Sequence, residues 1–171
     1  ASTTVEICGL YWGFTPGFWK NHTASSPSGN NAWLYTAFTP GEALADHFNL
    51  GVIANLYPKG SSDTFSSMET TLLKALRFKG GSGFTGAGEI LMRAAVASLL
   101  NSSFNEVMGH EIGLSAVWPY TTEEIISMVE DVLNGDYSSE ADRITAMLTL
   151  AGVLDGFNNG YEYFDWTWPI P

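Results

Sequence analysis

Apolar positions in the second half of the chain follow the period of an α-helix. From Thr85 to Leu100 they cover most faces, which is typical of a helix buried at the centre of a domain. A second stripe follows the capping box at 121–124 and stops at an Asn-Gly pair. A third begins near Ser139 and stops at Asp155-Gly156. The pattern predicts a central helix followed by two more.

Weaker signals in the first half predict two shorter helices. Thr39 has the place of an N-cap, Pro40 that of the first helical residue and Glu42 that of the acid at the third helical position. We therefore expect a helix over 39–48. A similar box at 66–69 predicts a helix over 66–77 that a glycine-rich corner ends. The pattern over 104–120 is weak, and there we expect a turn of helix and an irregular loop.

The two ends of the chain have strand-like patterns. Residues 2–12 are rich in β-branched and aromatic side chains, and residues 161–169 alternate aromatic and polar ones. These segments could pair with each other, whereas residues 32–38 fit a short strand or an aromatic plug. The predicted fold is therefore mainly α, a bundle of four to five short helices with a small β element formed by the N- and C-terminal segments. We expect one domain, with a strand over 1–12, a helical core over 13–160 and a strand or tail over 161–171.

The stretch 13–22 concentrates the most unusual residues. Proline next to glycine predicts a tight turn over 15–17, and the flanking aromatic rings can bury large areas on both sides of it. We call residues 15–22 the clasp and expect it to fix the first strand against the helices. Its last three residues are expected to hydrogen-bond the backbone, with the Asn21 amide turned inward, although they could instead meet a ligand, metal or partner. The clasp consists of Thr15, Pro16, Gly17, Phe18, Trp19, Lys20, Asn21 and His22.

Charge restricts the classes of partner. The chain has 7 basic and 18 acidic residues, a net charge of −11, so binding to the phosphates of nucleic acids or to anionic membranes is not expected. Its longest largely apolar run, 90–100, is shorter than a membrane-spanning helix needs, so no membrane insertion is expected. Cations, neutral glycans and other copies of the chain remain as partners.

Three further features bear on the compartment. The sequence starts with Ala1, as a secreted chain does after removal of a signal peptide, so an extracellular or cell-surface location is expected. Cys8 is the single cysteine, so it stays buried or pairs with another molecule. Asn21 and Asn101 each begin an acceptor pattern for N-glycosylation, and Asn101 is the candidate for modification.

Three segments together resemble a known family. Gly17 to His22 is similar to the G-[YF]-W-K-N-H signature of a domain found in many secreted bacterial and archaeal surface proteins. Residues 90–101 look like the central helix of that domain, and residues 154–160 look like its closing motif. The resemblance covers roughly residues 8–160 and implies a noncatalytic extracellular module. Family members often have a cysteine before the signature and another near the closing motif, whereas here Cys8 has no such mate.

Enzymatic and metal chemistry is less well supported. His22, His47 and His110 with Glu111 could form a zinc site, but their spacing matches no metal motif. No nucleophile elbow or nucleotide loop occurs. Acidic residues could hold calcium, although helix caps and turns explain them more simply. The calcium candidates are Asp131, Asp136, Glu140, Asp142, Asp155, Asn158 and Asn159. No cofactor is expected.

The resulting functional hypothesis is a noncatalytic structural protein that self-associates into a filament or surface layer by addition of its N-terminal strand. A terminal strand needs a sheet edge, and a head-to-tail contact of this kind propagates. The alternative is a monomeric carbohydrate-binding module that uses the aromatic tail; a metal-dependent hydrolase is weaker. The expected assembly interface comprises Val5, Ile7, Cys8, Tyr163, Trp166 and Trp168.

Overall fold

The structure is a computed structural model that describes residues 11–26, 29–111 and 118–160, with the side chains of residues 110 and 111 excepted. The described chain is mainly helical and contains no sheet, only an isolated bridge between Ala43 and Thr71. The mainly α prediction is therefore confirmed. Residues 11 and 12 are not in a strand, and the remainder of the predicted β element, at 1–10 and 161–171, lies outside the described residues.

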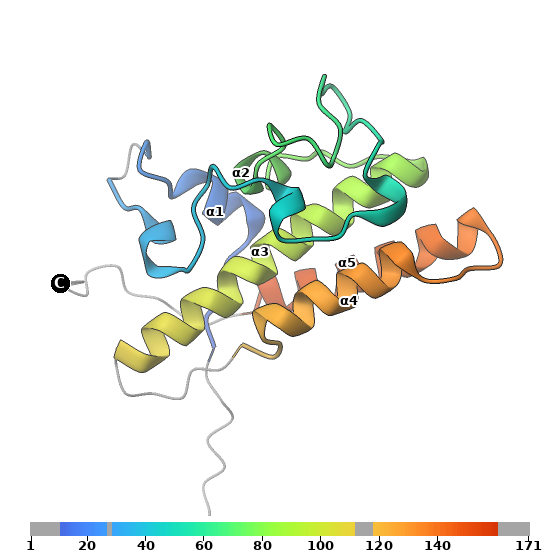
Figure 1. Cartoon of the computed structure of the whole chain (residues 1–171). Helices are drawn as coiled ribbons and strands as arrows, with labels where there is room; N and C mark the ends of the chain where they lie inside the picture. The colour runs from blue at the N-terminus through green and yellow to red at the C-terminus, as the bar shows by residue number, and fades with distance from the viewer. Residues whose placement is uncertain (1–10, 27–28, 112–117, 161–171) are drawn as a thin grey trace, which may run out of the picture.

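Helix α3 (Gly83–Glu111) runs through the middle of the molecule. Figure 1 shows two layers against it: α4 and α5 pack on one side, and the long N-terminal part with α1 and α2 covers the other. The α3 helix is buried along most of its length, so the prediction of a central helix is confirmed. Its buried apolar residues belong to one cluster that reaches from Trp19 to Leu154.

The second half follows the sequence pattern closely. Helix α4 (Thr122–Asn134) begins after Thr121, whose side chain and Glu124 form the complete capping box. Helix α5 (Glu140–Asn158) begins after the N-cap Ser139 and ends three residues later than the Asp155-Gly156 stop predicts. The extension matters, because it places Asn158 inside the helical core.

The first half is less helical than predicted. Residues 39–48 form a turn and one 3-10 segment, η2 (Leu44–Asp46), instead of a helix. Residues 66–77 contain only α2 (Leu72–Ala75), which Thr71 caps. The backbone groups that longer helices would need are used elsewhere: Leu44 N–H donates to Thr70 O at 2.8 Å, and Leu72 N–H donates to Glu42 O at 2.9 Å. These long-range bonds compete with helix propagation.

Two open questions near the clasp are resolved. Residues 32–35 form the 3-10 segment η1 (Ala32–Tyr35), in which Trp33 is buried, so the aromatic plug is correct and the strand is not. The predicted tight turn at 15–17 is wrong. Thr15 caps helix α1 (Pro16–Asn21) by accepting from Phe18 N–H, and Pro16 is its first residue, where a missing N–H costs nothing.

The loop at 104–120 also differs from its prediction. Helix α3 continues through residues 104–111 because one face remains apolar, with Phe104 and Met108 buried one turn apart. Residues 112–117 lie outside the described part. The extra turns carry Asn105, which contacts the N-terminal segment.

Candidate functional site

The N-terminal segment is attached to α3 by two asparagine side chains one turn apart. Asn105 Oδ1 accepts from Trp12 N–H and its Nδ2 donates to Trp12 O, both at 2.7 Å. Asn101 Oδ1 accepts from Phe14 N–H at 3.0 Å, and its Nδ2 donates to Phe14 O at 2.9 Å. Each amide thus pairs with one backbone residue as a neighbouring strand would. We call Asn101 and Asn105 the amide pair.

Asn101 also joins the other helices. Its Oδ1 accepts from Trp19 Nε1 at 3.0 Å, and its Nδ2 donates to Asn158 Oδ1 at 2.8 Å. Asn158 is itself fixed, because its Oδ1 accepts from Ser98 Oγ at 2.9 Å and its Nδ2 donates to Ala94 O at 3.0 Å. The three segments that carry the family resemblance therefore meet at one buried amide.

This position excludes one expectation. Asn101 is completely buried, and its Nδ2, the atom to which a glycan would attach, already donates two hydrogen bonds. The prediction of glycosylation at Asn101 is wrong for the folded protein. Asn158, a predicted calcium candidate, is likewise buried and uses its side-chain oxygen within the protein.

The clasp is built from aromatic contacts around Trp19, which is fully buried. Phe14 stacks on Phe18 with ring centroids 4.2 Å apart, and Phe18 stacks on His22 at 4.0 Å. Trp33 Nε1 donates to Trp19 O at 3.0 Å, which ties the plug to α1. The aromatic and structural role predicted for these residues agrees with this packing.

The three polar residues of the clasp differ from one another. His22 Nδ1 lies 2.8 Å from Phe18 O, in agreement with the expected bond to the backbone. Lys20 and Asn21 are exposed, so the expectation of an inward Asn21 amide is wrong. Trp19 takes the core-facing side of α1, so the next two residues of the helix lie on its outer sides.

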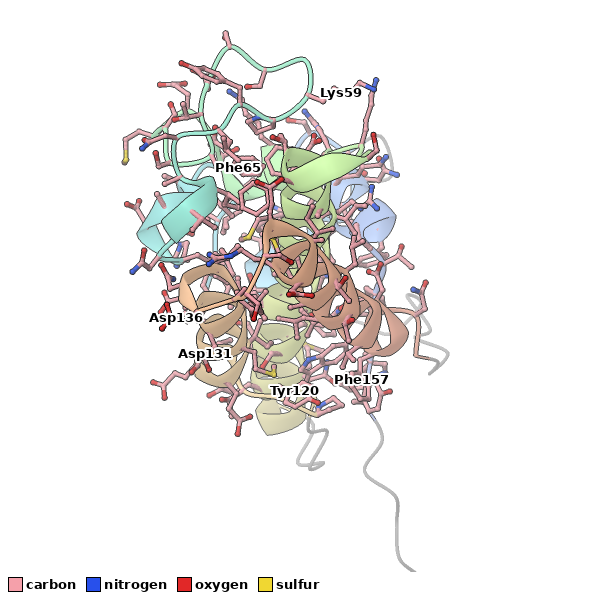
Figure 2. The ribbon with its side chains drawn as sticks, turned by 90° about the vertical axis from the view of Figure 1, so that its right-hand side faces the viewer. Lys59, Phe65, Tyr120, Asp131, Asp136 and Phe157 are labelled. Atoms are coloured by element: carbon pink, nitrogen blue, oxygen red, sulfur yellow. The ribbon has the colours of Figure 1, made fainter. Side chains whose placement is uncertain are left out.

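Both ends of the described chain lie at the same place. A Cβ added to Gly13 would stand 2.3 Å from Phe157 O and 2.8 Å from Gly160 O, so only glycine fits between α3 and the end of α5. The Tyr11 ring contacts Trp118 at 5.2 Å and Phe157 at 6.2 Å between centroids. Figure 2 shows Phe157 next to Tyr120 at this end of the molecule, opposite Lys59. The segments before residue 11 and after residue 160 therefore start from neighbouring points.

The predicted assembly interface lies outside the described residues, and the predicted bridge at Cys8 is not tested for the same reason. The interface residues are Val5, Ile7, Cys8, Tyr163, Trp166 and Trp168.

Of the predicted zinc candidates, His22 and His47 have separate partners, and the side chains of His110 and Glu111 lie outside the described part of the chain. His47 Nε2 lies 3.2 Å from Glu42 Oε1, whereas His22 is occupied in the clasp. Within residues 11–26, 29–109 and 118–160, no three His, Cys, Asp or Glu side chains are grouped so that they could hold a metal ion. In the same part of the chain, no helix is both long and apolar enough to cross a membrane.

Sequence reasoning missed the function of the amide pair. The available signal was a row of polar residues at helical spacing in an apolar helix, since Ser98, Asn101 and Asn105 share one face. The glycosylation pattern drew attention to Asn101 alone.

Comparison with protein-family models, with curated proteins and with solved structures finds no match for this chain.

Proposed function

We propose that this protein is a noncatalytic structural component of an extracellular surface that self-associates into a filament or layer through its N-terminal segment. The observation that carries the proposal is the amide pair. By holding the backbone of Trp12 and Phe14 with four hydrogen bonds, it fixes the point at which residues 1–10 join the helical core. The sequence pattern of residues 2–12 predicts a strand, and a strand attached at a fixed point is suited to add to a neighbouring copy.

Two further features support the proposal. The resemblance of residues 17–22, 90–101 and 154–160 to secreted surface modules favours the extracellular location. The two terminal segments start side by side, near Tyr11 and Gly160, so one copy could offer both a donor strand and an edge that accepts one. Val5 and Ile7 alternate along the donor, and in strand addition alternate side chains determine register.

The test compares two variants with the same added charge. Val5→Asp with Ile7→Asp places two carboxylates on the apolar face of the proposed donor strand, whereas Ser2→Asp with Thr4→Asp places two on the opposite face. We expect the first variant to be monomeric and the second to assemble like the wild type. Size-exclusion chromatography and negative-stain microscopy measure the outcome.

Deletion of residues 1–8 provides an independent measurement and should also abolish assembly. Thermal unfolding of each variant checks that the core is intact. We expect no change in melting temperature, because all changed residues come before Trp12, the first residue that the amide pair holds. Assemblies that persist unchanged in both the deletion and the Val5→Asp/Ile7→Asp variant would show that strand addition by this segment is wrong.

A further inference from the structure

Most of the basic side chains of this acidic protein lie around one pocket. Four of the seven Lys and Arg residues line a cavity of about 340 Å³ at the end of the molecule opposite Phe157 (Figure 2): Lys59, Lys74, Arg77 and Lys79. The lining contains only two acids, Asp63 and Glu89. In a chain of net charge −11, this pocket is a local positive site, and such a site attracts anions.

The rim of the pocket is held firmly against α3. Arg93 Nη1 donates to Phe78 O at 2.8 Å and to Lys79 O at 3.4 Å. The following residue, Gly80, has φ +77°, and a Cβ there would lie 2.6 Å from Ile90 Cγ1. Arg93 and Gly80 thus position the backbone that presents Phe78 and Lys79.

Three of the four cations are available to a ligand. Lys74 Nζ lies 3.5 Å from Asp63 Oδ2 and is already paired. Lys59, Arg77 and Lys79 are exposed and form no ion pair with any residue that the structure describes, and Arg77 and Lys79 come from the same edge of the pocket. Their long side chains can turn toward an anion at the rim at little conformational cost to the fold.

The floor of the pocket has a different chemistry. Glu89 is 2% exposed, and its Oε1 accepts a hydrogen bond from Lys59 N–H at 3.2 Å. Burial raises the pKa of this carboxyl, in spite of the opposing effects of that hydrogen bond and of Lys59 and Arg93. A carboxyl group at the floor accepts hydroxyl groups and disfavours a second anion there. The half-buried Phe78 adds an apolar surface beside it.

We propose that this pocket binds an acidic sugar, a pyranose that carries one carboxylate, such as a uronic acid unit of a polysaccharide. Arg77 and Lys79 receive the carboxylate at the rim, Glu89 accepts hydroxyl groups at the floor, and Phe78 packs against the apolar face of the ring. The volume lies within the range of about 300–1,000 Å³ that is usual for small-ligand sites. The site lies at the end of the molecule opposite Phe157 (Figure 2), and binding there does not depend on self-association.

Calorimetric titration of the full chain at low ionic strength tests the site. The ligands are sodium glucuronate, glucose, sodium acetate and a hexaglutamate peptide. We expect glucuronate to bind at least about fivefold more tightly than glucose or acetate, because each of these carries only part of the recognised chemistry. Hexaglutamate should bind more weakly than glucuronate, since the floor carboxyl disfavours a second charge.

Matched single substitutions identify the pocket as the binding site. Lys79→Gln should weaken glucuronate binding by about threefold, the usual effect of losing one solvent-exposed ion pair, and Arg77→Gln by at least as much. Lys20→Gln removes the same charge from the exposed surface of α1 and should leave the affinity unchanged. Unaltered melting temperatures show that the variants are folded.

Four results would overturn the proposal. They are absence of glucuronate binding, acetate binding as tight as glucuronate binding, hexaglutamate binding tighter than both, and equal weakening by Lys20→Gln and Lys79→Gln. The second result means a simple anion site, the third an acidic peptide site, and the last nonspecific attraction.

Discussion

The Asn101 side chain satisfies polar groups from three distant parts of the chain: the backbone of Phe14, the indole of Trp19 and the amide of Asn158. Replacing it with alanine removes four hydrogen bonds, each worth about 0.5–1.5 kcal/mol, and takes the acceptor away from the buried Trp19 indole N–H, which adds a cost of about 1–3 kcal/mol. We therefore expect Asn101→Ala to lower the free energy of unfolding by at least about 3 kcal/mol. Urea denaturation followed by circular dichroism measures the change.

Asn21→Ala is the control, because Asn21 is the other asparagine of a glycosylation pattern and is exposed. It should change the stability by less than about 0.5 kcal/mol. If the free energy of unfolding of Asn101→Ala lay within about 1 kcal/mol of the wild-type value, water would have replaced the hydrogen bonds of the amide.

Glu89 gives the stability a pH dependence whose sign follows from its environment. Burial raises its pKa above the ordinary value of 4.5, so the folded state binds this proton more tightly than the unfolded state does. Its contribution to stability is fully present below pH 4.5 and is lost as the pH rises through the folded-state pKa. Glu89→Gln removes the dependence, so the stability of the variant relative to the wild type should rise between pH 4 and pH 7.

Thermal unfolding across this pH range measures the difference. Glu69→Gln, at an exposed position, should show no such trend. A gain of equal size in both variants would assign the effect to net charge and not to the burial of Glu89.

The role of a residue could be predicted from the sequence where its own size and its neighbours in the chain determine that role. It could not be predicted where contacts with distant segments determine it. The aromatic core of the clasp follows from the size of Phe18 and Trp19 alone. The role of Asn101 depends on residues more than 50 positions away in both directions, which no local pattern encodes. Exposure of Asn21 was missed because the turn at 15–17 is a helix start, and this changes which side of the segment faces the core.

At the level of elements, the contact between the N-terminal segment and the end of α5 depends on Gly13. Gly13→Ala places a methyl group against the carbonyl oxygens of Phe157 and Gly160, and both are backbone atoms that cannot move away freely. We expect a loss of about 1–3 kcal/mol, the usual cost of overpacking a rigid site. Differential scanning calorimetry should show a lower melting temperature.

Gly41→Ala is the matched control for this substitution. Gly41 has no positive φ, and an added Cβ meets no atom within 4 Å. Its melting temperature should stay close to that of the wild type, and an equally large fall would point to a general effect of alanine in place of glycine.

The capping boxes show why similar sequence signals have different outcomes. At Thr121 the box is followed by a strong apolar stripe, and a full helix forms. At Thr39, Glu42 does accept a hydrogen bond from the Thr39 N–H, as the box requires, but the backbone then pairs with residues 70–72 instead of continuing as a helix. Helix α3 extends past its predicted end for the opposite reason, since contacts of Phe104 with Trp12, Phe14 and Trp19 stabilise turns whose local pattern is weak.

For the whole molecule, the net charge of −11 opposes association of identical copies. If the copies associate through backbone hydrogen bonds and apolar side chains, added salt should favour assembly by screening this repulsion. The screening length falls from about 30 Å at 0.01 M to about 8 Å at 0.15 M salt. Sedimentation velocity at these two salt concentrations should therefore show larger species at the higher one, whereas weaker assembly would indicate a contact between opposite charges.

Residue 11 and residue 160 lie next to each other, with Gly13 enclosed between α3 and the end of α5. A force applied between residues 11 and 160 would therefore load the contacts that join these two residues before it loads most of the helical core. It would act first on the hydrogen bonds of the amide pair and on the packing around Gly13, separating them one after another. The mechanical strength of the molecule under such a pull depends on this small region, and single-molecule stretching from the two ends would measure it directly.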